Sequence, residues 1–240
     1  MSALFISDLH LSASRPDITG EFERFLAGPA LQATDGLYIL GDLFDYWAGD
    51  DDLDDPFNVQ VIEALAQCGA RVPVRFMRGN RDFLIGKGFA RAARLTLMGD
   101  SAILNLGGLP TLLMHGDTLC TDDVDYQRFR AEVRSPAWAK TFLSMPLAER
   151  KRHIEALRAQ SEVQKQVKPA EIMDVNAATV EEAFRASGCD QMIHGHTHRP
   201  DRHRLTVDGR ACERLVLGDW YHQGSHLRCD SNECVAVGRA

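Results

Sequence analysis

The stretch LYILGD, residues 37–42, places four large apolar residues directly before a glycine and an aspartate. A short apolar run that ends in this way is typical of a fully buried strand. The carboxylate of Asp42 would then stand at the tip of the strand, where an unpaired buried charge is costly. Taken alone, Asp42 could equally cap the turn or helix that follows. Recurrence of the same pattern elsewhere in the chain favours a cation at this position.

Four further apolar runs also end in side chains that commonly bind metals. They are followed by Asp8 and His10, by Asn80, by His115, and by His196 and His198. Apolar residues at helical spacing between the first two runs predict a β-α-β unit, and therefore a parallel pair of strands. Because the carboxyl ends of strands in such a sheet meet at one edge, we expect these side chains to converge there.

The kinds of donor in this set indicate which metals would suit it. Histidine nitrogens, carboxylates and an amide oxygen favour Mn, Fe or Zn and differ from a thiolate site. Seven such residues are too many for one tetrahedral ion and fit two ions that share a bridging carboxylate. A single histidine after a strand is commonly structural, so the hypothesis depends on the recurrence at five strand ends.

Composition is that of an ordinary globular protein. The 240 residues are 45% apolar and 25% charged, and no run approaches the ~18 apolar residues of a membrane-spanning helix. The first residues do not resemble a signal peptide, so we expect a cytoplasmic protein. The six cysteines lie far apart without a CxxC pair, which favours free buried thiols over a disulfide framework.

Charge is unevenly distributed along the chain. The net charge of −7 argues against a general nucleic-acid binder, yet residues 123–170 carry ten Lys and Arg against six Asp and Glu. This basic segment predicts either an anionic partner or a solvated helical face. Its apolar spacing, broken at Pro136 and Pro146, predicts a helical insertion or lid at 123–169 within a core of residues 1–122 and 170–240. The acidic run at 49–55 lacks the glycine and terminal Glu of an EF-hand, so we interpret it as a solvated loop.

Five short motifs give the chain a family resemblance. They are DxH at 8–10, GD at 41–42, GNxD at 79–82, HGD at 115–117 and GHxH at 195–198. Together they resemble the calcineurin-like metallophosphoesterases over about residues 3–220. The resemblance implies an α/β fold with two packed β-sheets flanked by helices, and metal-assisted hydrolysis of a phosphate ester or anhydride.

The resemblance also implies which residues hold which ion. One ion would be bound by Asp8, His10, Asp42 and His198. The other would be bound by Asp42, Asn80, His115 and His196. Asp42 would therefore bridge both ions.

Arg81 departs from the pattern of the wider family, which has a histidine after the motif asparagine to protonate the leaving oxygen. An arginine cannot supply that proton, but it can neutralise phosphate charge through two hydrogen bonds. Such a site suits a leaving group that needs no proton, namely another phosphate, whose second pKa is about 6. This favours a pyrophosphate bond as the substrate. The alternative is that Arg81 only pairs with Asp82.

Longer motifs resemble one branch of the family, the UDP-2,3-diacylglucosamine diphosphatases of lipid A biosynthesis. These motifs are GNRDFL at 79–84, HGDTLCTDD at 115–123, IMDVN at 172–176 and HGHTHRP at 194–200. The resemblance implies hydrolysis of UDP-2,3-diacylglucosamine to UMP and 2,3-diacylglucosamine 1-phosphate (lipid X), usually with Mn²⁺, at the cytoplasmic face of the inner membrane. It implies catalytic roles for Asn80, Arg81 and His196, and substrate contacts by these three together with Asp123, Ser161, Lys165 and Lys168.

The predicted lid offers apolar side chains that could shelter acyl chains or form the lid's own core. They are Trp138, Phe142, Leu143, Met145 and Leu147. The stretch 147–157, with Arg150, Lys151, Arg152 and the adjacent Arg158, could lie on an anionic membrane surface. Two other functions stay open: an enzyme of the same fold that acts on another nucleotide or phosphoester, and a metal-binding scaffold without catalysis. The sequence does not determine an oligomeric state.

Overall fold

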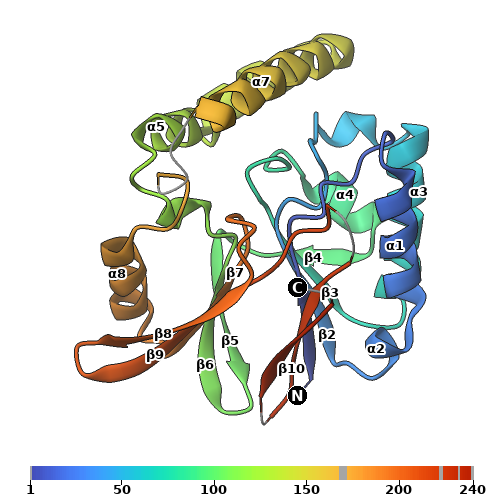
Figure 1. The fold of residues 1–240 in the computed structure, drawn as a ribbon. Helices are drawn as coiled ribbons and strands as arrows, with labels where there is room; N and C mark the ends of the chain where they lie inside the picture. The colour runs from blue at the N-terminus through green and yellow to red at the C-terminus, as the bar shows by residue number, and fades with distance from the viewer. Residues whose placement is uncertain (1, 168–171, 222–223, 232, 239–240) are drawn as a thin grey trace.

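Two β-sheets pack face to face at the centre of the molecule (Figure 1). The computed structural model describes residues 2–167, 172–221, 224–231 and 233–238, with the backbone alone for residues 160–167. The first sheet has the order β11-β10-β1-β2-β3-β4 and the second β5-β6-β7-β9-β8. The strands are β1 (Ala3–Ile6), β2 (Gly36–Leu40), β3 (Val74–Met77), β4 (Leu95–Leu97), β5 (Ser101–Leu106), β6 (Leu109–Met114), β7 (Gln191–His194), β8 (Asp201–Val207), β9 (Arg210–Val216), β10 (His226–Cys229) and β11 (Cys234–Val237).

The first sheet is buried on both faces at β1 and β2, where every residue is buried. β1 to β4 are parallel, as the predicted β-α-β unit requires. On β2, Leu37 and Ile39 face a cluster shared with helices, whereas Tyr38 and Leu40 face the second sheet. Alternate residues of one continuous apolar run therefore enter two different cores.

Helices cover the outer face of each sheet. The first sheet is covered by α1 (Pro16–Ala27), α3 (Pro56–Gly69) and α4 (Lys87–Ala92), and α8 (Ala177–Ser187) packs on the second. Their ends follow local sequence signals: the Asn176 side chain accepts a hydrogen bond from Thr179 N at the start of α8, and Gly188 adopts the left-handed conformation after its last turn. The layers are thus helix, sheet, sheet, helix, as the family resemblance implied.

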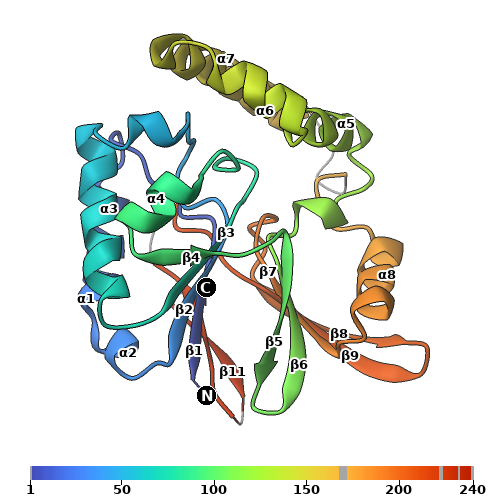
Figure 2. The same cartoon turned by 180° about the vertical axis from the view of Figure 1, so that it is seen from behind.

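Three helices lie together beyond one edge of the sandwich (Figures 1 and 2). They are α5 (Val124–Val133), α6 (Pro136–Leu143) and α7 (Leu147–Val167). The predicted breaks are confirmed, since α6 begins at Pro136 and α7 begins directly after Pro146. These helices span the carboxyl ends of the parallel strands, the edge at which the sequence predicts the metal site.

Some features were not predicted. The short strand β4 extends the first sheet, and the short helix α2 (Pro29–Gln32) follows α1. Cys229 and Cys234 form a disulfide, so the expectation of free thiols is wrong for these two and right for the four buried cysteines that remain. The two residues lie directly opposite each other on β10 and β11, a pairing that only the hairpin register creates. In the part of the chain that the structure describes, no helix combines the length and the apolar character needed to cross a bilayer.

Candidate metal centre

The seven candidate ligands all follow strands that end at the same edge. Asp8 and His10 follow β1, Asp42 follows β2, Asn80 follows β3, His115 follows β6, and His196 and His198 follow β7. β1, β2 and β3 run parallel in one sheet, and β6 and β7 run parallel in the other. Packing the two sheets face to face therefore brings donors from both to a single point.

One half of the cluster consists of Asp8, His10 and His198 beside Asp42. His10 Nε2 lies 3.3 Å from His198 Nε2, and His198 Nε2 lies 3.3 Å from Asp8 Oδ1. Asp42 Oδ2 lies 3.9 Å from His10 Nε2. Three donors close enough to share an ion thus stand next to one oxygen of Asp42.

The other half consists of Asn80, His115 and His196. Asn80 Oδ1 lies 2.9 Å from His196 Nδ1 and 3.1 Å from His115 Nε2. His115 Nε2 lies 3.7 Å from Asp42 Oδ1, the other oxygen of the same carboxylate. Asp42 therefore stands between the two halves, with one oxygen toward each.

Several hydrogen bonds orient the ligand groups from behind. The Ser7 hydroxyl donates to Asp8 Oδ2 at 2.6 Å, and the His196 backbone N–H donates to the same oxygen at 2.8 Å. His115 Nδ1 lies 2.8 Å from the Leu40 carbonyl, to which it can donate only as the N–H tautomer. This arrangement leaves His115 Nε2 as the lone-pair nitrogen that faces the cluster.

Two glycines permit the close approach of the loops. A Cβ on Gly79 would lie 2.1 Å from Asp42 Oδ1, and a Cβ on Gly195 would lie 2.2 Å from Asp8 Oδ2. The GNxD and GHxH motifs therefore need glycine because a carboxylate occupies the space of the missing side chain.

The buried charges alter the pKa values of the ligands. Burial opposes protonation of His115, but the carboxylates of Asp42 and Asp8 outweigh it and raise the pKa of His115 to about 8. Burial and the nearby His115 lower the pKa of His196 to about 3, which keeps its imidazole in the neutral form that binds metals. Burial also raises the pKa of Asp42 above its ordinary value. A cation here would favour the ionised Asp42 and would displace the proton of His115.

The cluster fits divalent metal ions. Two groups of three residues could each hold an ion. In each group, every residue offers one ligand atom, and the three atoms lie within 4.8 Å of one another. The first group is Asp8, His10 and His198, and the second is Asp8, Asp42 and His115. The donors are nitrogens and oxygens, the set that suits Mn, Fe or Zn. Asp8 is fully buried, and burial of an ionised carboxylate requires a compensating positive charge.

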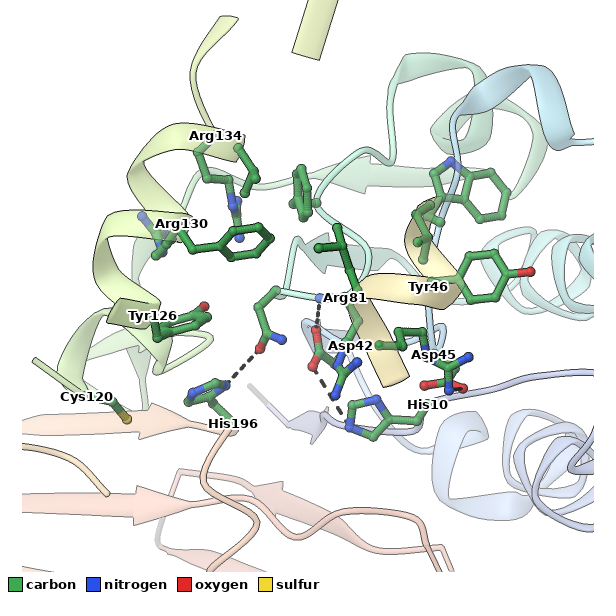
Figure 3. Close-up of a pocket in the computed structure, with 18 of the residues that line it drawn as sticks. His10, Asp42, Asp45, Tyr46, Arg81, Cys120, Tyr126, Arg130, Arg134 and His196 are labelled. Carbon is green, nitrogen blue, oxygen red and sulfur yellow. Dashed lines mark hydrogen bonds and ion pairs between the residues drawn. The ribbon is translucent and has the colours of Figure 1, made fainter. Parts of the chain in front are cut away.

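A cavity of about 540 Å³ opens between the cluster and the three outer helices (Figure 3). Four predicted substrate residues, Asn80, Arg81, Asp123 and His196, line it. The side chains of the other three, Ser161, Lys165 and Lys168, lie outside the described residues. The Asp82 oxygens accept hydrogen bonds from the backbone of Leu43, Phe44 and Gly79.

The lid side of the cavity is apolar. Its lining residues there are Phe129, Val133, Trp138, Phe142, Ile154 and Leu157. Trp138 and Phe142, for which the sequence left open a role in sheltering acyl chains or in the lid's own core, line the cavity and stack with their ring centroids 4.6 Å apart. Leu143, Met145 and Leu147 are not among the lining residues, and Leu143 is 43% exposed. The predicted apolar surface therefore exists but is assembled from all three helices.

The acidic run is not the solvated loop that the sequence suggested. Asp51 pairs with Arg150, Lys151 bridges Asp52 and Asp55 at 2.8 and 3.1 Å, and Asp45 pairs with Arg158. Arg150 is only 1% exposed and also donates to the carbonyls of Ala48 and Met145. Three of the four lid cations assigned to a membrane surface are thus bound to the core, and Arg152 alone of the four is exposed.

Two residues that support the site were not predicted from the sequence. Asp117, 3% exposed, accepts hydrogen bonds from Tyr126 and Arg130 at 2.9 and 2.6 Å. Asp219 Oδ2 lies 3.5 Å from His198 Nδ1, on the side of the ring away from the cluster. Asp117 could have been suspected from its place in the HGD motif, whereas no local pattern marks Asp219.

Comparison with known proteins identifies relatives of the whole chain. A family model described as calcineurin-like phosphoesterase matches residues 1–200. A UDP-2,3-diacylglucosamine hydrolase from Aromatoleum aromaticum is 53% identical over 233 residues, which cover 96% of this chain and 94% of that protein. A protein of the same name from Stenotrophomonas maltophilia is 50% identical over 97% of this chain and 96% of its own length. Another from Cellvibrio japonicus is 51% identical over 93% of this chain and 93% of its own length. The similarity therefore includes the outer helices as well as the strands that carry the cluster.

Proposed function

The chain belongs to the calcineurin-like phosphoesterase family, and we propose that it hydrolyses the diphosphate bond of UDP-2,3-diacylglucosamine to release UMP and 2,3-diacylglucosamine 1-phosphate. The observation that carries the proposal is one cavity that joins a metal-binding cluster to an apolar chamber under the lid. A lipid-linked nucleotide needs both environments in a single site. The relatives that share about half of the sequence carry the name of this activity.

We propose two ions in this centre, both Mn²⁺. Asp8, His10 and His198 would hold the first, Asn80, His115 and His196 the second, and Asp42 both. When bound, such a pair would lower the pKa of a shared water and offset charge on the phosphoryl oxygens. The position of Asp42 between the two halves of the cluster supports the bridging role, with its oxygens 3.7 and 3.9 Å from His115 and His10.

The protein's own polar groups would bind and orient the diphosphate. Asn80 and His196 line the cavity beside the cluster, and Arg81 lines it from the same loop as Asn80. A guanidinium stays charged at every accessible pH and can contact two phosphate oxygens at once. It would stabilise charge on the leaving phosphate, which departs without needing a proton because its second pKa is about 6.

The lid, which we propose as a separate unit at residues 123–169, would hold the acyl chains. Its apolar lining comes from α5, α6 and α7. Each CH₂ group that leaves water contributes roughly 0.8 kcal/mol, so even partial shelter of two acyl chains would favour binding substantially. Asp123, at the start of α5, lines the same cavity between the cluster and the lid.

We further propose that the protein acts at the cytoplasmic surface of the inner membrane, where a lipid substrate would be found. Val124 and Leu143 are exposed by 52 and 43% on α5 and α6. These apolar side chains, with the exposed Arg152, could contact an anionic leaflet without a spanning helix.

The decisive experiment measures Mn²⁺-dependent release of UMP from UDP-2,3-diacylglucosamine. We expect turnover by the wild type, a loss of at least about 10²-fold in Asp42→Ala, and no loss in Asp54→Ala, which removes an exposed carboxylate. Hydrolysis of a soluble nucleotide but not of the lipid would identify another enzyme of the fold. Bound metal without hydrolysis of either substrate would identify a scaffold.

A further inference from the structure

Arg134, which directly follows the last residue of the lid helix α5, reaches the loop that carries Asn80. Its NH2 group donates a hydrogen bond of 2.8 Å to the backbone carbonyl of Gly79. The guanidinium also lies 5.3 Å from the ring centre of Phe83, in the same loop. The side chain is 16% exposed and is further held by Asp100, whose Oδ1 lies 3.6 Å from its NH1. A lid residue therefore contacts the loop that carries Asn80, and Figure 3 shows it on the α5 side of the cavity.

The hydrogen bond from Arg134 to Gly79 can affect the metal ligands because Gly79 contacts Asp42 and directly precedes Asn80. Its Cα packs so tightly against Asp42 that no Cβ would fit, and its N–H donates to Asp82 Oδ1 at 2.8 Å. Asn80 follows directly, with its Oδ1 within 3.1 Å of both His115 and His196. The Gly79–Asn80 peptide thus connects the bridging carboxylate to the second half of the cluster.

A glycine peptide in such a position needs to be held at both ends. Glycine has the widest backbone freedom of all residues, so its neighbouring peptide planes rotate readily unless they are bonded. Asp82 holds the N–H of Gly79, and Arg134 holds its carbonyl. Removal of the second bond would let the peptide turn and would move the Asn80 side chain away from His115 and His196.

A second arginine of α5 holds the other loop of the same half-site. Arg130 Nε donates to Asp117 Oδ2 at 2.6 Å, two residues beyond His115. Arg130 also pairs with Asp100, 3.4 Å away, so the two arginines share one carboxylate. One lid helix therefore contacts the segments that carry Asn80 and His115.

We propose that Arg134 is a positioning residue that fixes Asn80 through the Gly79 carbonyl, so that the lid helix sets the geometry of the second metal site. The proposal rests on the metal centre of the proposed function. It makes the lid part of the hydrolytic machinery as well as a shelter for acyl chains. Partners behind metal ligands typically change metal affinity or activity by about 10- to 100-fold when they are removed.

The test replaces Arg134 by methionine. The methionine side chain can still pack on Phe83, but it lacks the N–H groups of the guanidinium. Calorimetric titration of the metal-free protein with Mn²⁺ should show one equivalent bound about 10- to 100-fold more weakly and the other unchanged. With UDP-2,3-diacylglucosamine, kcat should fall by a similar factor while KM stays near the wild-type value. Arg134→Lys, which keeps one donor, should recover part of both losses.

Arg128→Met is the matched control, because Arg128 lies on the same helix with its side chain 78% exposed. It should leave Mn²⁺ binding and turnover unchanged, and thermal melting should show that all variants are folded. If Arg134→Met fails to fold, the comparison of Arg134→Lys with the wild type decides the question.

A raised KM with unchanged kcat and unchanged Mn²⁺ binding would overturn the proposal and make Arg134 a substrate contact. Two equal Mn²⁺ affinities in every variant would also overturn it. The titration decides even if the wild type releases no UMP, a result that would count against the substrate alone.

Discussion

Substitution of Gly79 by alanine tests how closely the two central loops must approach. A Cβ at this position would lie 2.1 Å from Oδ1 and 2.3 Å from the backbone N of Asp42, whereas real Cβ contacts are essentially never under 3.0 Å. Because one of the two atoms belongs to the backbone, a side-chain rotation cannot relieve the clash. The loops after β2 and β3 must separate by roughly 1 Å, a displacement that costs about 10²-fold in rate when it misplaces reacting groups.

The expected result is a fall of about 10²-fold in turnover with weakened Mn²⁺ binding, since Asp42 and Asn80 move apart. Overpacking should also reduce the free energy of unfolding by about 1–3 kcal/mol. Release of UMP, calorimetric titration with Mn²⁺ and thermal melting measure the three effects. Gly99→Ala is the control, because its Cβ would meet no atom closer than 3.4 Å. Wild-type turnover and Mn²⁺ affinity in Gly79→Ala would refute the geometric reasoning.

Three further predictions concern the cavity and the lid. Arg81→Ala should lower kcat by about 10²-fold. The metal site should stay occupied, because the variant keeps the backbone N–H that donates to the bridging carboxylate. Loss of metal from the purified variant would contradict this. Arg150→Met should lower the free energy of unfolding by roughly 1–3 kcal/mol, measured by thermal melting, since the carbonyls of Ala48 and Met145 lose a donor. The hydrogen bond from Arg150 holds the pKa of Asp51 below its ordinary value of 3.8, so the ionised form stabilises the fold above that pH and the contribution disappears below it. Melting curves of Asp51→Asn should therefore lie below those of the wild type at pH 7 and converge with them under acidic conditions; a constant difference would exclude this linkage.

The ends of β1 and β2 could be predicted because both strands are buried at every position and therefore form short apolar runs. In β2, both faces are buried, so the run from Leu37 to Leu40 is continuous and its end at Gly41 is abrupt. A ligand that follows such a run is placed at the sheet edge by the strand itself. The parallel order of β1, β2 and β3 then fixes where these ends meet, which is why the positions of Asp8, Asp42 and Asn80 follow from sequence.

The contacts of the lid could not be predicted in this way. Asp51 and Arg150 are 99 residues apart, and each looks like a solvated charge in its own segment. Their pairing depends on where α7 lies over the core, which no local pattern specifies. The same holds for Arg134 and the Gly79 carbonyl, because a backbone acceptor leaves no mark on the sequence.

The backbone at the metal centre holds most of the candidate ligands in conformations that the surrounding structure must impose. Seven described residues other than glycine have a positive φ, and five of them are candidate ligands: Asp8, His10, Asp42, His196 and His198. Such conformations cost of order 1–3 kcal/mol each and persist only where the surroundings determine them. Here the surroundings are fully buried strands and backbone hydrogen bonds between the loops, such as those from Asp8 to the Gly41 carbonyl and from His10 to the Asp42 carbonyl. The strain is thus offset by packing and by hydrogen bonds within the protein. Chelation should abolish the release of UMP, and thermal melting should show that the protein stays folded because the strands and loop hydrogen bonds remain; unfolding on chelation would contradict this.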